Sequence, residues 1–290
     1  MKKFCTINTD NDYTCFSYNQ IKQIVRLYNK TTEEKINLNL PMNEMYNALL
    51  SKIDKCKGKG DICLIEQCFI RANSKIYKEL EKNLMPIRPS GKYDWLSTTD
   101  IKEYMERLMI KYPDFYSIGP VPIDFADPNV GCFKINTELE CLGSLNLNRF
   151  YKIGFRKIGI VFNTDPSYKS GQHWIASFID LNKKEINFWD SYGKNPTREI
   201  LELFNTLQKY AIKIPGNPID RFIININNVR HQYAGSECGV YCMYFITQSV
   251  KNIPFNRIIN KVIKDEEMNQ MREIYFRTPF TGGDDCTWVT

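Results

Sequence analysis

Apolar residues recur at spacings of three and four positions in the first part of the chain. Two segments, 18–30 (YNQIKQIVRLYNK) and 42–53 (MNEMYNALLSKI), follow this spacing, which is typical of amphipathic helices. A polar, glycine-containing break at 55–61 and a segment at 84–94 with two prolines and a glycine interrupt the pattern. The pattern predicts a small helical accessory domain over residues 1–88.

The pattern changes in the rest of the chain, where short apolar runs alternate with helical stretches. Ser97 and Asp100 have the spacing of a capping box at the start of a helix over 95–112. Segments that are rich in β-branched and aromatic residues, as strands are, lie at 157–165, 173–181, 184–193 and 221–229. Helical spacing returns at 197–214, which Pro215 ends, at 238–250 and at 254–276. We therefore predict a mixed α+β domain over residues 89–290.

Composition places the chain among ordinary globular proteins. Of its 290 residues 43% are hydrophobic and 25% charged, and the formal net charge of +6 permits weak contact with DNA without indicating it. The N-terminus lacks the apolar stretch of a signal peptide, and the longest apolar runs, such as IGIVF, are far shorter than a membrane span. We expect a soluble protein made in a cytosol-like compartment.

The ten cysteines are expected to stay mostly reduced in such a compartment. Cys56, Cys63 and Cys68 lie close together in sequence, but the chain has no C-x-x-C pair and no histidine nearby. Buried structural thiols are therefore a better interpretation of this group than a zinc site. No metal ion or organic cofactor is expected.

One cysteine has surroundings that suit a nucleophile. Cys238 begins the predicted helix over 238–250, where the positive end of the helix dipole favours a thiolate. A cysteine nucleophile also needs a base and a group that orients the base, and the chain contains only two histidines, His173 and His231. A single buried cysteine is usually structural, so the interpretation depends on these partners.

His173 has a carboxylate within its own hairpin, whereas His231 has none in its segment. If the two strands pair symmetrically about a turn centred between Leu181 and Asn182, His173 and Asp190 face each other directly across the ladder. Asp190 would then accept a hydrogen bond from one imidazole nitrogen. A register error of one residue would turn a side chain to the other face and remove the contact.

Two groups near Cys238 are candidates for stabilising an oxyanion. They are the backbone N–H of Cys238 and the side-chain amide of Gln232, six residues upstream. Gly239 would let the substrate backbone approach closely, and Cys242, one helical turn on, is expected to face the core. Together these residues predict Cys-His-Asp nucleophilic catalysis with a glutamine oxyanion donor.

These motifs resemble the adenain/Ulp1-like clan of cysteine peptidases. HW at 173–174, FWDSYG at 188–193 and HQYAGSECGVY at 231–241 follow the clan's order of His, Asp, Gln and Cys and its spacing from Gln to Cys. The match is closer to the polyprotein-processing peptidases of large cytoplasmic DNA viruses of the asfarvirus and mimivirus kind, through FNTDPSYKSGQHWIASFID, NNVRHQYAGSECGVY and DEEMNQMR. At the position of Glu237 many cellular members have Asp, whereas the viral group has Glu, as this chain does.

The resemblance implies a thiol protease with a mixed central sheet flanked by helices and a helical N-terminal arm. It implies His173 as general base and Asp190 as its orienting group, with Gln232 as oxyanion donor and Cys238 as nucleophile. The substrate-binding residues Trp174 and Trp95 resemble the aromatic walls of a groove that admits only glycine-like residues; the region of Trp95 is more divergent.

The protein substrate that the resemblance implies is a viral structural or core polyprotein. It would be cleaved after Gly-Gly-like motifs during virion maturation, in the virion and the host cytoplasm. The C-terminal Gly282-Gly283 is a candidate for self-processing, or part of a flexible end.

Three other interpretations stay open at this point. A protease for ubiquitin-like modifiers would accept their Gly-Gly tails in the same groove. An acetyltransferase on the same fold would share the triad chemistry, and a catalytically inactive binding module would need none of it.

Overall fold

The computed structural model describes residues 4–6, 12–91, 93–127, 129, 141–214 and 220–281. The chain divides into two compact units, Met1–Arg88 with Ile274–Thr290, and Pro89–Glu273. The sequence-based division differs from this one at the C-terminal end, which it kept with the second unit. The physical reason is backbone pairing: Arg277 is fully buried, its N–H donates to the Pro86 carbonyl (2.8 Å), and its carbonyl accepts the N–H of Arg88 (2.9 Å).

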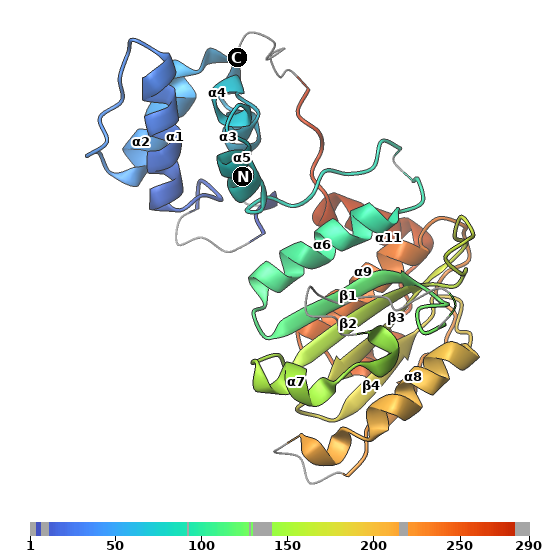
Figure 1. Ribbon diagram of the computed structural model, residues 1–290. Helices are drawn as coiled ribbons and strands as arrows, with labels where there is room; N and C mark the ends of the chain where they lie inside the picture. Colours follow the sequence, from blue (N-terminus) through green and yellow to red (C-terminus); the bar gives the residue numbers. More distant parts are fainter. Residues whose placement is uncertain are drawn as a thin grey trace. The chain divides into compact units, whose positions relative to one another are not determined.

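The N-terminal unit is helical, as the apolar spacing predicts. Its helices are α1 (Tyr18–Thr31), α2 (Met42–Lys52), α3 (Gly60–Ile65), α4 (Cys68–Arg71) and α5 (Ser74–Glu81) (Figure 1). A capping box of Ser17 and Gln20 begins α1. The apolar faces of these short helices pack into one shared core.

The expectation that the cysteines stay mostly reduced is wrong. Disulfides join Cys5 to Cys15 and Cys56 to Cys63, with Cα atoms 5.2 Å and 5.3 Å apart. Cys68 and Cys141 are also disulfide-bonded, which leaves two free thiols among the described residues, both in α9. Gly58 and Gly60 have positive φ angles of 76° and 65°, so the chain reverses between Cys56 and Cys63 and the two sulfurs meet.

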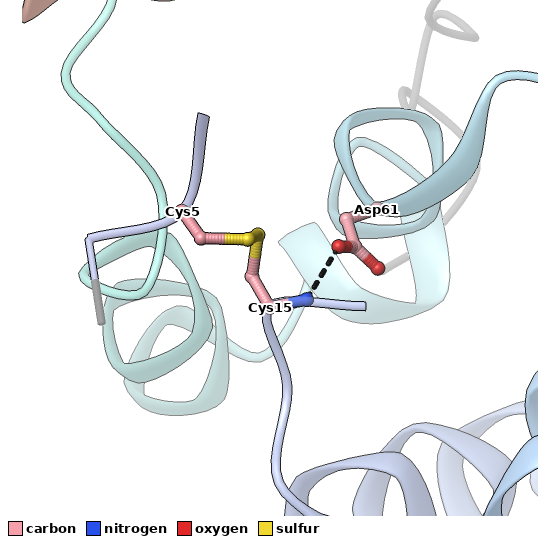
Figure 2. Close-up of side chains that lie close together, drawn as sticks. All are labelled: Cys5, Cys15 and Asp61. Atoms are coloured by element: carbon pink, nitrogen blue, oxygen red, sulfur yellow. Dashed lines mark hydrogen bonds between the residues drawn. A yellow bond between two sulfur atoms is a disulfide. The ribbon is translucent and has the colours of Figure 1, made fainter. Parts of the chain in front are cut away.

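Asp61 lies beside the first of these disulfides (Figure 2). One carboxylate oxygen accepts the N–H of Cys15 (2.7 Å) and the other accepts the hydroxyl of Thr14 (2.5 Å), while burial raises the pKa of Asp61. The sulfurs of Cys5 and Cys15 are bonded to each other and are not available as thiolate ligands. This group therefore ties the N-terminal segment to α3.

The second unit contains a five-stranded mixed sheet whose spatial order follows the sequence (Figure 1). The strands are β1 (Phe115–Pro122), β2 (Lys157–Asn163), β3 (Trp174–Asp180), β4 (Glu185–Trp189) and β5 (Ile223–Ile226). The pairs β1–β2 and β4–β5 are parallel, and β2–β3 and β3–β4 are antiparallel. The sequence analysis missed β1 because its sequence, FYSIGPVP, contains residues that are typical of turns.

Helices cover both faces of the sheet, which confirms the predicted α+β class (Figure 1). On one face lie α6 (Thr98–Lys111) and α9 (Cys238–Val250), and on the other α7 (Leu147–Lys152) and α8 (Arg198–Gln208). Phe178 packs against Phe245 of α9, whereas Phe188 packs against Phe204 of α8. The capping box of Ser97 and Asp100 starts α6 as predicted.

The chain closes with two short helices, α10 (Phe255–Asn260) and α11 (Asp265–Tyr275), where the sequence indicates one. α8 ends at Gln208 and a 3₁₀ turn follows at Ala211–Lys213, before Pro215. Within the described ranges, no helix combines the length and the apolar character that crossing a bilayer requires.

The register of the β3–β4 hairpin differs from the predicted register by two residues. The observed pairs run from Asp180 opposite Glu185 to Ala176 opposite Trp189, around a four-residue turn. One further pair would place Ile175, and not His173, opposite Asp190. A shift of two residues returns each side chain to the same face of the sheet, so His173 and Asp190 become diagonal neighbours that remain within reach.

The disulfide pairing predicts which cysteines react in denatured protein that has not been reduced. The two free thiols should be alkylated completely, whereas the peptides of the Cys5–Cys15 and Cys56–Cys63 pairs should stay linked until a reductant is added. Peptide mapping by mass spectrometry measures both. Alkylation of Cys56 and Cys63 without reductant would contradict the pairing.

Candidate active site

Strand ends bring the predicted site residues to one edge of the sheet. His173 directly precedes β3, Asp190 directly follows β4, and Gln232 lies on the chain that leaves β5. Since β4 is antiparallel to β3 and parallel to β5, the start of β3 and the ends of β4 and β5 share this edge. Cys238 is the first residue of α9, and its side chain is hydrogen-bonded to the imidazole of His173.

His173 lies between the Cys238 thiol and a carboxylate. Its Nε2 atom is 2.8 Å from Oδ1 of Asp190, which also accepts the backbone N–H of Tyr192 at 2.8 Å. The side chains of His173 and Asp190 are 12% and 5% exposed, so water competes little for this contact. Because Nε2 is engaged by Asp190, Nδ1 is the nitrogen left for Cys238. The three residues form a connected Cys-His-Asp triad.

The surroundings of His173 keep its imidazole protonated at neutral pH. Burial lowers the pKa of His173, but the hydrogen bonds to Asp190 and Cys238 and the negative charges of these groups raise it more, to about 9. An imidazolium next to a thiol favours the thiolate form, which is the reactive nucleophile.

The second histidine belongs to the core. His231 is buried, with its ring 4.7 Å from that of Trp189 and edge-on to Tyr241 at 6.3 Å. Burial lowers the pKa of His231 and favours the neutral imidazole. The contacts of His231 are thus those of a packing residue.

The side-chain amide of Gln232 has a fixed orientation. Its Nε2 donates to the carbonyl of Ala234 (2.9 Å), which can only accept, and its Oε1 accepts the hydroxyl of Ser191 (2.6 Å). Gln232 is fully buried, and its own N–H donates to the Ser191 carbonyl (2.9 Å). One amide proton of Nε2 therefore remains for a ligand.

The loop between Gln232 and Cys238 is held by the first residue of α11. Oδ2 of Asp265 accepts the backbone N–H groups of Tyr233 (2.9 Å) and Ala234 (2.8 Å). Its Oδ1 lies 3.1 Å from the hydroxyl of Tyr241, a residue of α9. Asp265 thus links the loop to α9, which begins with Cys238.

Two further residues of α11 hold the end of this loop. Asn269 donates to the carboxylate of Glu237 (2.8 Å) and accepts from Nε of Arg272 (3.0 Å). Arg272 is buried and donates to the Ser236 carbonyl (3.0 Å). Together with Asp265 these residues occupy positions i, i+4 and i+7, which lie on one face of a helix. That face of α11 supports the backbone immediately before Cys238.

The predicted groove residues lie near the start of α9. Trp174 is nearly buried and its indole N–H donates to the Leu96 carbonyl (2.9 Å), whereas Trp95 is 50% exposed. A Cβ atom at Gly239 would lie 3.1 Å from Cβ of Leu96 and 3.3 Å from Cδ1 of Ile101. Close packing of this segment accounts for the glycine. Substrate contact by Trp174, Trp95 and Gly239 stays a prediction.

Sequence analysis missed Ser191 and the three supporting residues of α11. Ser191 directly follows Asp190 in FWDSYG, and the helical spacing within DEEMNQMR is visible in the sequence. Neither pattern identifies the loop that these residues contact. The predicted self-processing site, Gly282-Gly283, lies outside the described residues.

The chain is similar in sequence to known cysteine proteases. The model of the Ulp1 protease family, C-terminal catalytic domain, matches residues 157–281. A putative thiol protease of Acanthamoeba polyphaga mimivirus is 29% identical over 285 residues, covering 91% of this chain and 89% of the relative. The SUMO-1 cysteine protease of African swine fever virus (isolate Pig/Kenya/KEN-50/1950) is 25% identical over 244 residues, covering 79% and 87%.

The fold is also that of a solved viral protease. The crystal structure of the African swine fever virus protease matches with a TM-score of 0.67 at 21% identity, covering 95% of this chain and 96% of that chain. The range of the family match, 157–281, contains the positions of His173, Asp190, Gln232 and Cys238. Residues 157–281 carry a Ulp1-like cysteine protease domain, and the chain is similar to the thiol proteases of mimivirus and African swine fever virus.

Proposed function

We propose that this protease is a viral endopeptidase that cleaves structural or core polyproteins after Gly-Gly-like motifs during virion maturation. The observation that carries the proposal is the triad itself, in which His173 is hydrogen-bonded to both Asp190 and Cys238 while the amide of Gln232 is held by Ser191. The viral setting is supported by the similarity to the mimivirus protease, which extends over 91% of the chain. The host cytoplasm and the virion are the corresponding locations.

Acylation uses the groups as the structure arranges them. The Cys238 thiolate attacks the scissile carbonyl carbon, and the C=O electron pair moves onto the oxygen. Nε2 of Gln232 and the N–H of Cys238, a helix N-terminal amide without an internal acceptor, donate to this oxyanion. As the C–N bond breaks, the His173 imidazolium gives its proton to the leaving amine.

Deacylation restores the starting state. Neutral His173 takes a proton from a water molecule whose oxygen attacks the thioester carbonyl. The C–S bond then breaks, the thiolate leaves, and the imidazolium is again paired with it. The carboxylate of Asp190 stays hydrogen-bonded to Nε2 of His173 during both steps.

The preference for small residues is supported by the elements around Cys238. The indole N–H of Trp174 donates a hydrogen bond to the backbone carbonyl of Leu96, and the Leu96 side chain packs against the position of Gly239. Two segments far apart in sequence therefore converge beside the nucleophile. A substrate residue without a side chain has the easiest approach there.

A second candidate is a protease for ubiquitin-like modifiers. The observation that favours it is the name of the African swine fever virus relatives, SUMO-1 cysteine protease, and such modifiers end in Gly-Gly tails. The prediction of DNA contact rests on net charge alone, and neither candidate function requires it.

Replacing the nucleophile tests the proposed function. Wild-type protein should cleave a Gly-Gly-x peptide reporter, and Cys238→Ala should lose detectable cleavage because no thioester can form. Cys242→Ala is the matched control, since it removes the other free thiol, one turn further along α9. It should retain most of the activity.

A SUMO-like fusion in the same assay separates the two candidates. Cleavage of the fusion without cleavage of the peptide would favour the modifier protease. Cleavage by Cys238→Ala equal to that of the wild type would refute the assignment of the nucleophile.

The contact between Ser191 and Gln232 predicts a coupled effect on catalysis. Gln232→Ala should lower kcat by about 10²–10³-fold, as the loss of one oxyanion donor does. Ser191→Ala should lower kcat by roughly 10-fold with little change in KM, because the amide loses the donor that orients it. The double variant should be no slower than Gln232→Ala.

The measurement is kcat and KM of the three variants, with thermal unfolding as a control for folding. Independent losses that multiply in the double variant would show that Ser191 does not act through Gln232.

A further inference from the structure

An exposed arginine lies between two tyrosine rings beside the active site. The guanidinium carbon of Arg230 is 4.5 Å from the ring centre of Tyr233 and 5.5 Å from that of Tyr192. Its Nε donates to the backbone carbonyl of Gln232 (2.8 Å). The ring of Tyr192 in turn stacks on the imidazole of His173, with centroids 4.6 Å apart. Arg230 is thus held by neighbours of both the base and the oxyanion donor.

The position of Arg230 is within reach of a bound substrate. The separations along His173, Tyr192 and Arg230 put the guanidinium carbon no more than about 10 Å from the centre of the imidazole. An extended peptide rises ~3.3 Å per residue, so about three residues span that distance. A substrate residue about three positions from the scissile bond can therefore reach Arg230.

The charge of Arg230 has no protein partner in the described part of the chain. Its Nε donates to the Gln232 carbonyl. Its terminal nitrogens make no hydrogen bond or ion pair with the described residues. Three carboxylates of the active-site region have other partners: Asp190 has His173, Glu237 has Asn269 and Asp265 has the loop backbone. Lys194, with its ammonium 5.5 Å from the Tyr192 ring centre, adds a second positive charge.

The backbone fixes this arrangement. Gly193 has a φ angle of +69°, and a Cβ atom there would lie 2.9 Å from the carbonyl carbon of Val229 and 3.0 Å from the amide nitrogen of Arg230. Only glycine allows the turn after β4 to approach this segment so closely. The turn that carries Tyr192 is therefore placed directly against Arg230.

We propose that Arg230 forms a subsite for an acidic side chain of the substrate within about three residues of the scissile bond. A guanidinium binds a carboxylate through two parallel hydrogen bonds. Stacking between two rings holds Arg230 in place before the substrate arrives, so less side-chain freedom is lost on binding. The inference rests on the proposed function and adds to it a substrate class, peptides with Asp or Glu near the cleavage point.

The test is a panel of blocked peptides that all keep the Gly-Gly motif, with Glu, Gln or Lys at the residue before Gly-Gly and at each of the three residues after the scissile bond. For wild-type protein we expect kcat/KM about 10-fold higher with Glu than with Gln at one position. Arg230→Gln should reduce this ratio to about 1, and Arg230→Glu should prefer Lys over Glu there. Lys209→Gln, which removes a cation stacked on a tyrosine outside this site, should keep the wild-type ratio.

Each ratio compares two peptides on one protein preparation, so a partly folded variant does not alter it. Cleavage of every peptide by the wild type without preference for Glu would overturn the subsite and leave the proposed function standing. No cleavage of any peptide, with or without Glu, would overturn the proposed function. An unchanged preference for Glu in Arg230→Glu would assign the preference to another residue.

Discussion

The hydrogen bond between Nε2 of His173 and Asp190 is the interaction on which the active site depends. It leaves Nδ1 for Cys238 and is the main reason that the pKa of His173 rises to about 9 despite burial. The contact joins residues just outside the two strands of one hairpin, so the register of β3 and β4 sets its geometry. The hairpin of β3 and β4 is thus the scaffold that places His173 against Asp190.

The turn after β4 organises the rest of the site, and each of its four residues has a separate part. Asp190 is hydrogen-bonded to His173 and Ser191 donates to the Gln232 amide oxygen, while Tyr192 stacks on His173 and contacts Arg230. Gly193 lets the turn approach the chain that leaves β5. Since α11 also supports the Gln232–Cys238 loop, the segment from Gln232 to Cys238 is held by two elements.

The sequence predicts those features whose signal is local. The spacing of apolar residues predicts α1, α2 and α9. The order of the motifs along the chain predicts that His173, Asp190, Gln232 and Cys238 belong to one site. The predicted register of the β3–β4 hairpin is wrong by two residues. The contact between His173 and Asp190 is nevertheless predicted correctly, because a shift of two residues leaves each side chain on the same face of the sheet. In α9 every residue except Gln248 is buried. The apolar run in its sequence indicates such a helix.

Features that depend on distant segments are not predictable in this way. The partners of Ser191 and α11 lie many residues away, and only the folded chain shows them. The Cys56–Cys63 disulfide forms where two glycines with positive φ reverse the backbone, which cysteine spacing does not encode. Strand β1 is hidden by its glycine and prolines, since the sheet pairs it with β2 despite poor local propensity.

The most direct test of this account is the pH dependence of kcat/KM for an uncharged Gly-Gly-x peptide, in wild-type protein and in Asp190→Asn. A raised pKa means that His173 stays protonated up to about pH 9, so wild-type activity should persist to that pH and fall above it. In Asp190→Asn the loss of the carboxylate should move this basic limb to lower pH. A basic limb at the same pH in both proteins would show that Asp190 does not control the protonation of His173, and would contradict the central role given to their hydrogen bond.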